Sequence, residues 1–343
     1  MKAVLLHQFG PAINFRVEEV PVPGPGPNEV LIRVHACGVC FHDVINRRGN
    51  LPRTRLPAVL GHEICGEVVA VGSEVRRLGL ADRVASLQRV NCGSCHYCVD
   101  RRPTLCRNGA VFFGEEIPGG YAEYVTSPEH VLSRVPANVP SSEAAVVACT
   151  LGTAVHVMCN RARLQPGQTV LITGASGGVG VHAIQLARLL GARVIAVTTS
   201  PPKVERLRAL GAQEVLCTPD LQFSRQVKRL TGEGADVVVE VVGSATLDQS
   251  LHALRNGGKL VVVGNVASGS AGLNPGLVIL KELEVIGSFA TNIGELDYAL
   301  DLVSNGRIRI VLADEVSLSQ ATRAHELLES RSVTGRIVLN LAK

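Results

Sequence analysis

The sequence predicts an α/β protein with two domains: a mainly β domain and a doubly wound domain built on a parallel sheet. Its 343 residues are roughly twice the length of a common domain. Short alternating apolar runs dominate before about residue 150, whereas apolar runs alternate with helical segments after about residue 166. With 46% hydrophobic and 19% charged residues, the chain has the composition of a folded globular protein.

The first part of the chain is predicted to form antiparallel strands joined by turns. Apolar and polar residues alternate in 29–34, 65–71 and 121–125. Such alternation is typical of strands that bury one face. The segment 23–27 consists only of Pro and Gly and therefore predicts a turn.

The second part is predicted to be a parallel sheet with helical connections. Helices are expected at 179–190 and 203–210. The strands are expected at 169–173, 193–199, 214–217, 237–242, 259–264 and 284–287. Six strands are the number that a doubly wound dinucleotide-binding fold needs. A further helix at 296–304 and a strand at 335–339 are expected to return to the first domain.

Composition excludes several classes of protein. The net charge of +4 is spread along the chain without a basic run, which argues against a nucleic-acid partner. No stretch approaches the ~20 apolar residues of a membrane span, and the N-terminal segment lacks the pattern of a signal peptide. A cytoplasmic location without a membrane partner is therefore expected, and the ten cysteines are not expected to form a disulfide framework.

Four cysteines form a compact lobe with the spacing C-x2-C-x2-C-x7-C. They are Cys92, Cys95, Cys98 and Cys106. Four thiolates close a tetrahedron around zinc and leave no open position, so this spacing predicts a structural zinc site. A bacterial ferredoxin cluster fits less well because its fourth cysteine follows after three residues and precedes Pro. Unligated loop thiols are the remaining alternative.

A glycine-rich turn lies between the first predicted strand and helix of the second part. Its residues include Gly174, Gly177, Gly178, Val179 and Gly180. Glycines at such a turn let backbone N–H groups approach a pyrophosphate at the helix N-terminus. The turn therefore predicts nucleotide binding.

The end of the second strand of this part bears on the choice of cofactor. NAD-binding proteins place Asp or Glu there to hold the ribose 2′-hydroxyl. Here the segment carries Thr198, Thr199, Ser200 and Lys203, with no acid. A neutral turn followed by a lysine accepts a 2′-phosphate, so NADP(H) is favoured over NAD(H). The alternative is that Lys203 only opens a helix.

Three further potential metal ligands, Cys40, His62 and Cys149, are scattered along the chain. Spacing alone does not join residues so far apart, and a single buried cysteine is usually a small hydrophobic residue. A resemblance joins them. The motifs that carry it are 38–40 with Asp43, 61–63, the four-cysteine lobe, Cys149 followed by 152–154, and the glycine turn.

The chain resembles the zinc-containing alcohol dehydrogenases of the medium-chain dehydrogenase/reductase family over essentially its whole length. The resemblance implies a GroES-like catalytic domain at 1–150, completed by 288–343, and a Rossmann domain at 151–287. It also implies two zinc ions per subunit and a homodimer or homotetramer.

By the same resemblance, Cys40, His62 and Cys149 hold a catalytic zinc and leave a fourth position for water or substrate. Asp43 then orients His62 by accepting its second N–H, and Glu63 lies beside the metal. Asp43 as an ordinary turn carboxylate is the alternative.

His42 stands where the family often has a Ser or Thr that relays the alcohol proton. Imidazole also transfers protons near neutral pH, so His42 is predicted to act as an acid/base. The alternative is that it lines the pocket or bonds the cofactor ribose. Thr153 is expected near the nicotinamide and Arg336 near the cofactor phosphates, although each fits a packing or surface role equally well.

The resemblance predicts an oxidoreductase that interconverts a small alcohol with its aldehyde or ketone. Gly264, Asn265 and the segments 174–180 and 198–200 resemble the quinone oxidoreductase and acryloyl-CoA reductase branches of the family. Reduction of an enoyl-thioester or a quinone is therefore the alternative activity. A nucleotide-binding or RNA-binding protein without turnover is a third possibility, which the weak positive charge disfavours.

Overall fold

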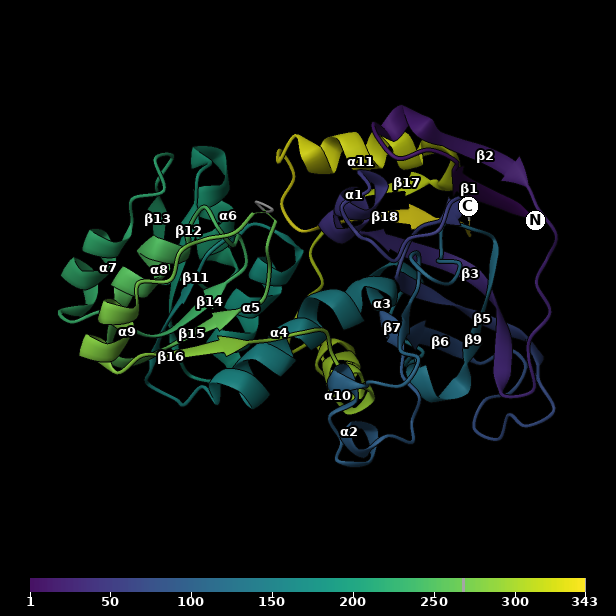
Figure 1. The fold of residues 1–343 in the computed structure, drawn as a ribbon, viewed down its shortest axis with the longest axis horizontal. Helices are drawn as coiled ribbons and strands as arrows, with labels where there is room; N and C mark the ends of the chain where they lie inside the picture. The colour runs from purple at the N-terminus through teal and green to yellow at the C-terminus, as the bar shows by residue number, and fades with distance from the viewer. Residues whose placement is uncertain (267–268, 343) are drawn as a thin grey trace. The chain divides into compact units, whose positions relative to one another are not determined.

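The computed structural model describes residues 1–266 and 269–342 and divides the chain into two compact units (Figure 1). The first unit consists of Met1–Gly152, Ala290–Gly306 and Leu312–Lys343. The second consists of Thr153–Phe289 and Arg307–Val311. The chain therefore leaves the first unit and later returns to it.

A seven-stranded sheet forms the centre of the described part of the first unit, in the order β10-β6-β5-β3-β18-β17, with β9 also paired to β3. The strands are β3 (Glu29–Val39), β5 (Glu63–Val71), β6 (Arg83–Ser86), β9 (Tyr124–Pro128), β10 (Leu132–Arg134), β17 (Leu312–Ser317) and β18 (Arg336–Asn340). Strand β18 lies antiparallel to β3 and pairs Ile337 with Val39. The C-terminal strand therefore lies beside the backbone that leads into Cys40.

Strand β3, at the centre of this sheet, is buried along most of its length. Val30, Ile32 and Val34 are at most 2% exposed and belong to the core of the unit, whereas Arg33 between them is exposed. Two smaller sheets complete the unit. They are formed by β1 (Lys2–Leu6), β2 (Phe15–Glu19) and β4 (Ala58–Val59), and by β7 (Arg89–Val90) and β8 (Val111–Phe112).

Short helices cover this sheet system. They are α1 (Phe41–Arg47), α2 (His96–Val99), α3 (Ser141–Val147), α10 (Ile293–Ser304) and α11 (Ala321–Glu329), with the 3₁₀ turns η1 (Ala12–Asn14), η2 (Pro103–Leu105), η3 (Glu129–Val131) and η7 (Leu318–Gln320). Helix α10 begins before the predicted residue 296 because of a capping box. The Asn292 side chain accepts from the Glu295 backbone N–H at 3.1 Å, and the Glu295 carboxylate accepts from the Asn292 N–H at 2.8 Å.

One helical stretch in the described residues, Ser141–Ala162, is long and apolar enough by length and composition to cross a membrane. The expectation that no stretch has this length and composition was therefore wrong. The stretch includes α3 and the π-helical segment η4 (Ala148–Gly152). Because 72% of its most apolar window is buried in the fold, it matches the core helix of a globular protein and is weak evidence for a span.

The second unit contains the predicted parallel sheet, with six strands in its described residues in the order β13-β12-β11-β14-β15-β16. The strands are β11 (Thr169–Ile172), β12 (Arg193–Thr198), β13 (Glu214–Cys217), β14 (Ala235–Glu240), β15 (Leu254–Val262) and β16 (Glu284–Gly287). All neighbouring pairs are parallel. This is the strand order of a doubly wound dinucleotide-binding fold, so the predicted fold class is confirmed.

Helices connect these strands. They are α4 (Thr153–Val155), the π-helical η5 (His156–Ala162), α5 (Gly178–Leu189), η6 (Pro201–Lys203), α6 (Val204–Ala209), α7 (Ser224–Thr231), α8 (Leu247–Ala253) and α9 (Pro275–Lys281). The turn from β11 to α5 requires glycine at two positions. Gly174 has a φ of +55°, and a Cβ on Gly180 would lie 2.5 Å from the Gly174 carbonyl oxygen. The backbone at the start of α5 is therefore closely packed at Gly180.

Candidate functional site

The first group of predicted site residues lies where β3 ends and α1 begins. Cys40 is the N-cap of α1, and its backbone N–H donates to Oδ2 of Asp43 at 2.8 Å. This bond satisfies one of the N–H groups that the start of a helix leaves without a partner. It also fixes Asp43 one turn from Cys40, with both side chains at the same end of the helix.

Cys40, His62 and Cys149 lie together in the first unit, although 109 residues separate the two cysteines. The Sγ atoms of Cys40 and Cys149 are 4.0 Å apart, and the Cys149 Sγ lies 3.7 Å from Nε2 of His62. Zinc bonds of about 2.3 Å to sulfur and 2.0 Å to nitrogen give tetrahedral edges of about 3.8 and 3.6 Å. The three donors therefore have the separations that a zinc ion requires.

The charge state of Cys40 suits a metal ligand. A hydrogen bond with Cys149, aided by the charges of Arg336 and His62, outweighs burial and lowers the pKa of the Cys40 thiol well below its ordinary value. The thiolate is the form that binds metals. Cys149 lies in the π-helical segment η4, and such segments occur frequently at functional sites.

Asp43 holds His62 in one orientation. Oδ1 of Asp43 lies 3.0 Å from Nδ1 of His62, and both residues are 1% exposed. Burial alone would raise the pKa of Asp43, but the charge and hydrogen bond of His62 outweigh it and lower that pKa. An ionised Asp43 accepts a hydrogen bond from the Nδ1–H group, which leaves the Nε2 lone pair directed to the cysteines.

Glu63 is the fourth group of this cluster. Its Oε1 lies 3.8 Å from Nε2 of His62 and 2.9 Å from Nη2 of Arg336. Burial raises the pKa of Glu63 to about 7, although Arg336 acts in the opposite direction. Neither carboxylate oxygen has a hydrogen-bond donor among the described residues. The cluster therefore brings together two thiols, an imidazole and a carboxyl group, a donor set that fits a divalent cation.

Arg336 lies in this cluster as well. It is 4% exposed, and its Nη2 is 3.7 Å from the Cys149 Sγ. A position of this residue near the cofactor phosphates stays a prediction. In the structure its guanidinium is engaged with Glu63 and Cys149.

His42 lies at the edge of the cluster with its side chain 32% exposed. Its Nε2 is 2.8 Å from Oε1 of Glu115, and its ring stacks on Phe112 at 5.3 Å. Oε2 of Glu115 pairs with Arg53 at 3.3 Å. Burial raises the pKa of Glu115, but the bond and charge of His42 outweigh it and lower that pKa. Sequence reasoning missed Glu115, because one acid in a turn carries no recognisable signal.

The four-cysteine lobe forms a second cluster. The Sγ atoms of Cys92 and Cys98 are 3.9 Å apart, those of Cys95 and Cys98 are 3.6 Å apart, and those of Cys95 and Cys106 are 4.0 Å apart. These distances match the tetrahedral edge of about 3.8 Å for zinc–sulfur bonds. Backbone N–H donors from Ser94 and Cys95 lower the pKa of Cys92 to about 6. The four sulfur atoms of the lobe are therefore close enough to one another to hold one metal ion.

The predicted cofactor residues lie in the second unit, apart from Arg336. The turn of Gly174, Gly177, Gly178, Val179 and Gly180 follows β11, the residues Thr198, Thr199, Ser200 and Lys203 end or follow β12, and Gly264 and Asn265 follow β15. These are carboxyl ends of parallel strands in one sheet, the edge where doubly wound folds bind ligands. Thr153 lies in α4 and is 5% exposed.

Exposure differs among the residues predicted to choose the cofactor. Thr198 is 6% exposed and its Oγ1 accepts from the Ser200 N–H at 3.2 Å, whereas Thr199 is exposed. Lys203 is 9% exposed, and burial lowers its pKa. No acidic residue stands at 198–203, as the sequence indicated.

Comparison with known proteins shows the family of this chain. Residues 26–137 match the model of the alcohol dehydrogenase GroES-like domain, and residues 178–305 match that of the zinc-binding dehydrogenases. The chain belongs to the zinc-binding medium-chain dehydrogenases. The family and its two-part fold, predicted from the sequence, are thereby confirmed, and the protein is an oxidoreductase of this family.

Family members named as acryloyl-coenzyme A reductases and as alcohol dehydrogenases are similar to this chain over nearly their whole length. An acryloyl-coenzyme A reductase of Metallosphaera sedula is 36% identical over 99% of both chains. An NAD-dependent alcohol dehydrogenase of Sulfolobus acidocaldarius is 34% identical over 99% of this chain and 100% of its own. These names leave the reaction open between two classes of substrate.

Solved structures of the family show the same architecture. The crystal structure of AibC is 55% identical with a TM-score of 0.94 and covers 100% of this chain and 96% of its own. A cobalt- and zinc-bound alcohol dehydrogenase of Pyrobaculum aerophilum is 31% identical with a TM-score of 0.91 and covers 99% of both chains. Metal-bound members with this fold therefore exist.

Proposed function

We propose that this protein is a zinc-dependent oxidoreductase that interconverts alcohols and aldehydes or ketones by hydride transfer with a nicotinamide cofactor. The convergence of Cys40, His62 and Cys149 at zinc-compatible distances is the observation that supports it. Three protein donors leave one tetrahedral position, as catalytic zinc sites do, whereas the four-thiolate lobe forms a complete structural set. Glu63, the remaining group, is paired with Arg336 at 2.9 Å.

Each residue of the site has its own role in the proposed reaction. When bound, zinc supplies a Lewis acid for the substrate oxygen, and the nicotinamide gives or takes the hydride. Cys40 and Cys149 supply negative charge, which offsets that of the metal. Asp43 keeps the proton of His62 on Nδ1 and thereby holds Nε2 in the donor set. Arg336 restrains Glu63 beside that set.

His42 is the proposed proton-transfer group. Glu115 binds its Nε2, so Nδ1 is the atom at which a proton is exchanged. The side chain is 32% exposed, which gives this proton a route to solvent. The carboxylate of Glu115, 2.8 Å from Nε2 of His42, holds the imidazole ring in one orientation.

Reduction of an enoyl-thioester is the second candidate. The full-length similarity to an acryloyl-coenzyme A reductase, at 36% identity, favours it. The complete three-donor set favours the first candidate, because a Lewis acid acts directly on a carbonyl or hydroxyl oxygen. The two candidates share the fold and the cofactor and differ in the bond that is reduced.

Turnover with and without metal separates these candidates. The purified protein is expected to hold two zinc ions per chain and to reduce members of an aldehyde and ketone panel with NADPH. Chelation should abolish this activity, and added zinc should restore it. Reduction of acryloyl-coenzyme A that survives removal of the zinc would instead establish the second candidate. Cofactor binding without any turnover would contradict both.

We further propose that NADP(H) is the preferred cofactor. The change Lys203→Ala is expected to raise the KM for NADPH about tenfold, or ~1.4 kcal/mol, while leaving that for NADH unchanged, because only NADPH carries the 2′-phosphate. Steady-state kinetics with both cofactors measure this. Lys228→Ala, a change on α7 of the same unit, serves as a matched control. An equal effect on both cofactors would mean that Lys203 only supports the start of α6.

Further proposals concern the substrate, the oligomeric state and the location of the enzyme. We propose a small-molecule alcohol or carbonyl substrate, a homodimer or homotetramer and a cytoplasmic location. Nucleic acid is not proposed as a partner. Size-exclusion chromatography with light scattering tests the oligomeric state.

A further inference from the structure

A buried chain of hydrogen bonds continues beyond Asp43 on the side away from the metal donors. The Tyr121 hydroxyl lies 3.4 Å from Oδ2 of Asp43 and 3.0 Å from Nε2 of His325. Tyr121 and His325 are both 0% exposed. The polar contacts of the candidate metal centre therefore extend through Asp43 to α11, near the C-terminal end of the chain.

The hydrogen bonds from Asp43 through Tyr121 to His325 can be assigned in only one direction. Asp43, as a carboxylate, accepts from His62, from the Cys40 backbone and from Tyr121. Tyr121 has a single hydroxyl proton, and burial raises its pKa well above the ordinary value, so it donates to Asp43 and accepts from His325. His325 must then carry its proton on Nε2.

The other nitrogen of His325 agrees with this assignment. Its Nδ1 has no hydrogen-bond partner among the described residues. An imidazolium would bury a second N–H group without an acceptor, which is costly. Burial lowers the pKa of His325 to about 4, so the ring is neutral at neutral pH. A neutral ring protonated on Nε2 satisfies every donor in the chain of hydrogen bonds.

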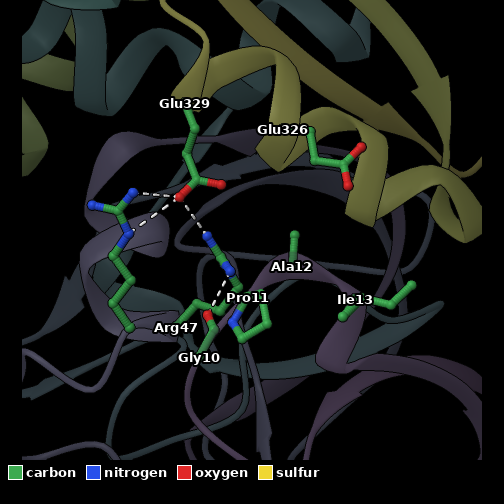
Figure 2. Close-up of a pocket in the computed structure, with 8 residues that line it drawn as sticks. Gly10, Pro11, Ala12, Ile13, Arg47, Glu326 and Glu329 are labelled. Atoms are coloured by element: carbon green, nitrogen blue, oxygen red, sulfur yellow. Dashed lines mark hydrogen bonds and ion pairs between the residues drawn. The ribbon is translucent and has the colours of Figure 1, made fainter.

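An ion pair also holds helix α11, which carries His325, against helix α1. His325 and Glu329 are four residues apart on α11, as are Asp43 and Arg47 on α1, so each pair lies on one helix face. Oε1 of Glu329 lies 2.7 Å from Nη2 of Arg47, which is 1% exposed, and 2.6 Å from Nη2 of Arg48 (Figure 2). An ion pair between the buried Arg47 and the partly exposed Glu329 thus accompanies the hydrogen bonds to Asp43.

We propose that Tyr121 and His325 are positioning residues for the metal centre, since they fix Asp43 as the acceptor that sets the tautomer and ring orientation of His62. This inference rests on the proposed function, because it assumes that His62 binds a metal. Neither residue touches the metal, substrate or cofactor. Both act through Asp43, as the hydrogen-bond partners of metal-binding histidines commonly do.

The test measures metal binding rather than turnover. Tyr121→Phe removes both hydrogen bonds of the hydroxyl, and His325→Leu removes the one to Tyr121. Each variant places an apolar side chain of similar size at the position. We expect each to weaken zinc binding at this centre about tenfold, the lower end of the range for outer partners of metal ligands. Competition with a chromophoric chelator measures the affinity. The visible spectrum of the cobalt-substituted protein should shift as well. The absorption bands that are lost in Cys40→Ser are the bands of this centre.

Two further variants separate positioning from packing. His325→Gln places an amide N–H near the position of Nε2 and should restore the affinity and the cobalt spectrum toward the wild type. Phe15→Leu is the packing control, because the Phe15 ring contacts those of His325 and Tyr121 at 4.8 and 6.3 Å without a hydrogen bond. This variant should leave both readouts unchanged.

Three results would overturn the inference, and the third is distinguishable from the first two. If folded Tyr121→Phe and His325→Leu proteins bind zinc with wild-type affinity and give the wild-type cobalt spectrum, the hydrogen-bond chain has only a structural role. Weakening by Phe15→Leu equal to that by Tyr121→Phe would lead to the same conclusion. If the wild-type chain holds a single zinc, in the cysteine lobe, the metal centre itself is wrong.

Discussion

Cys40→Ser is expected to hold one zinc ion per chain instead of two and to lose carbonyl reduction by at least about 10³-fold, since a catalytic metal supplies several kcal/mol of transition-state stabilisation. The Cys40 Sγ lies 4.0 Å from that of Cys149, within the separation of two ligands on one ion. A serine hydroxyl does not ionise at neutral pH and is a poor zinc ligand. Elemental analysis and initial rates on the aldehyde panel measure the two effects.

Cys217→Ser provides the matched control for this variant. Cys217 is a thiol at the end of β13 and belongs to neither cysteine cluster. It should keep two zinc ions and the wild-type rate. A Cys40→Ser protein that retains both ions would contradict the assignment of Cys40 as a ligand. One that lost an ion but reduced acryloyl-coenzyme A at the wild-type rate would favour the second candidate.

The fold of the second unit was predictable because its signals are local. The sequence predicted β16 at Glu284–Gly287 and, as the sixth strand that the fold needs, β13 at Glu214–Cys217, as the structure has them. The strand expected at 237–242 is instead Ala235–Glu240. Oε1 of Glu240 accepts the backbone N–H groups of Val242 and Gly243 at 2.9 Å, so the chain turns although its residues are apolar.

The candidate site was predictable only in part, because most of its contacts join residues that lie far apart in the sequence. The cysteine lobe was visible in the spacing, because all its ligands lie within 92–106. Cys40, His62 and Cys149 were joined only by resemblance. Glu115 was not found, because 73 residues separate it from His42, and 204 residues separate Tyr121 from His325. Tertiary structure, rather than any local pattern, brings such partners together.

Cys95→Ser is expected to unfold the cysteine lobe. Helix α2 and the turn η2, which carry the lobe between its cysteines, contain no buried residue, so apolar packing contributes little to its stability. Structural zinc sites supply much of the folding free energy of such segments. We expect one zinc ion per chain, proteolytic cleavage within 92–106 and a fall in Tm of about 10 °C, which corresponds to several kcal/mol for a chain of this size.

The comparison with Cys40→Ser makes this expectation specific. Both variants should lose one zinc ion, but only Cys95→Ser should become sensitive to protease in the lobe, because the metal centre at Cys40 lies in a well-packed part of the unit. Limited proteolysis with mass spectrometry locates the cut, and Val99→Ala, a change at an exposed position of α2, is the control beside the site. A Cys95→Ser lobe that resists cleavage and keeps the wild-type Tm would show that packing, and not the four thiolates, stabilises it.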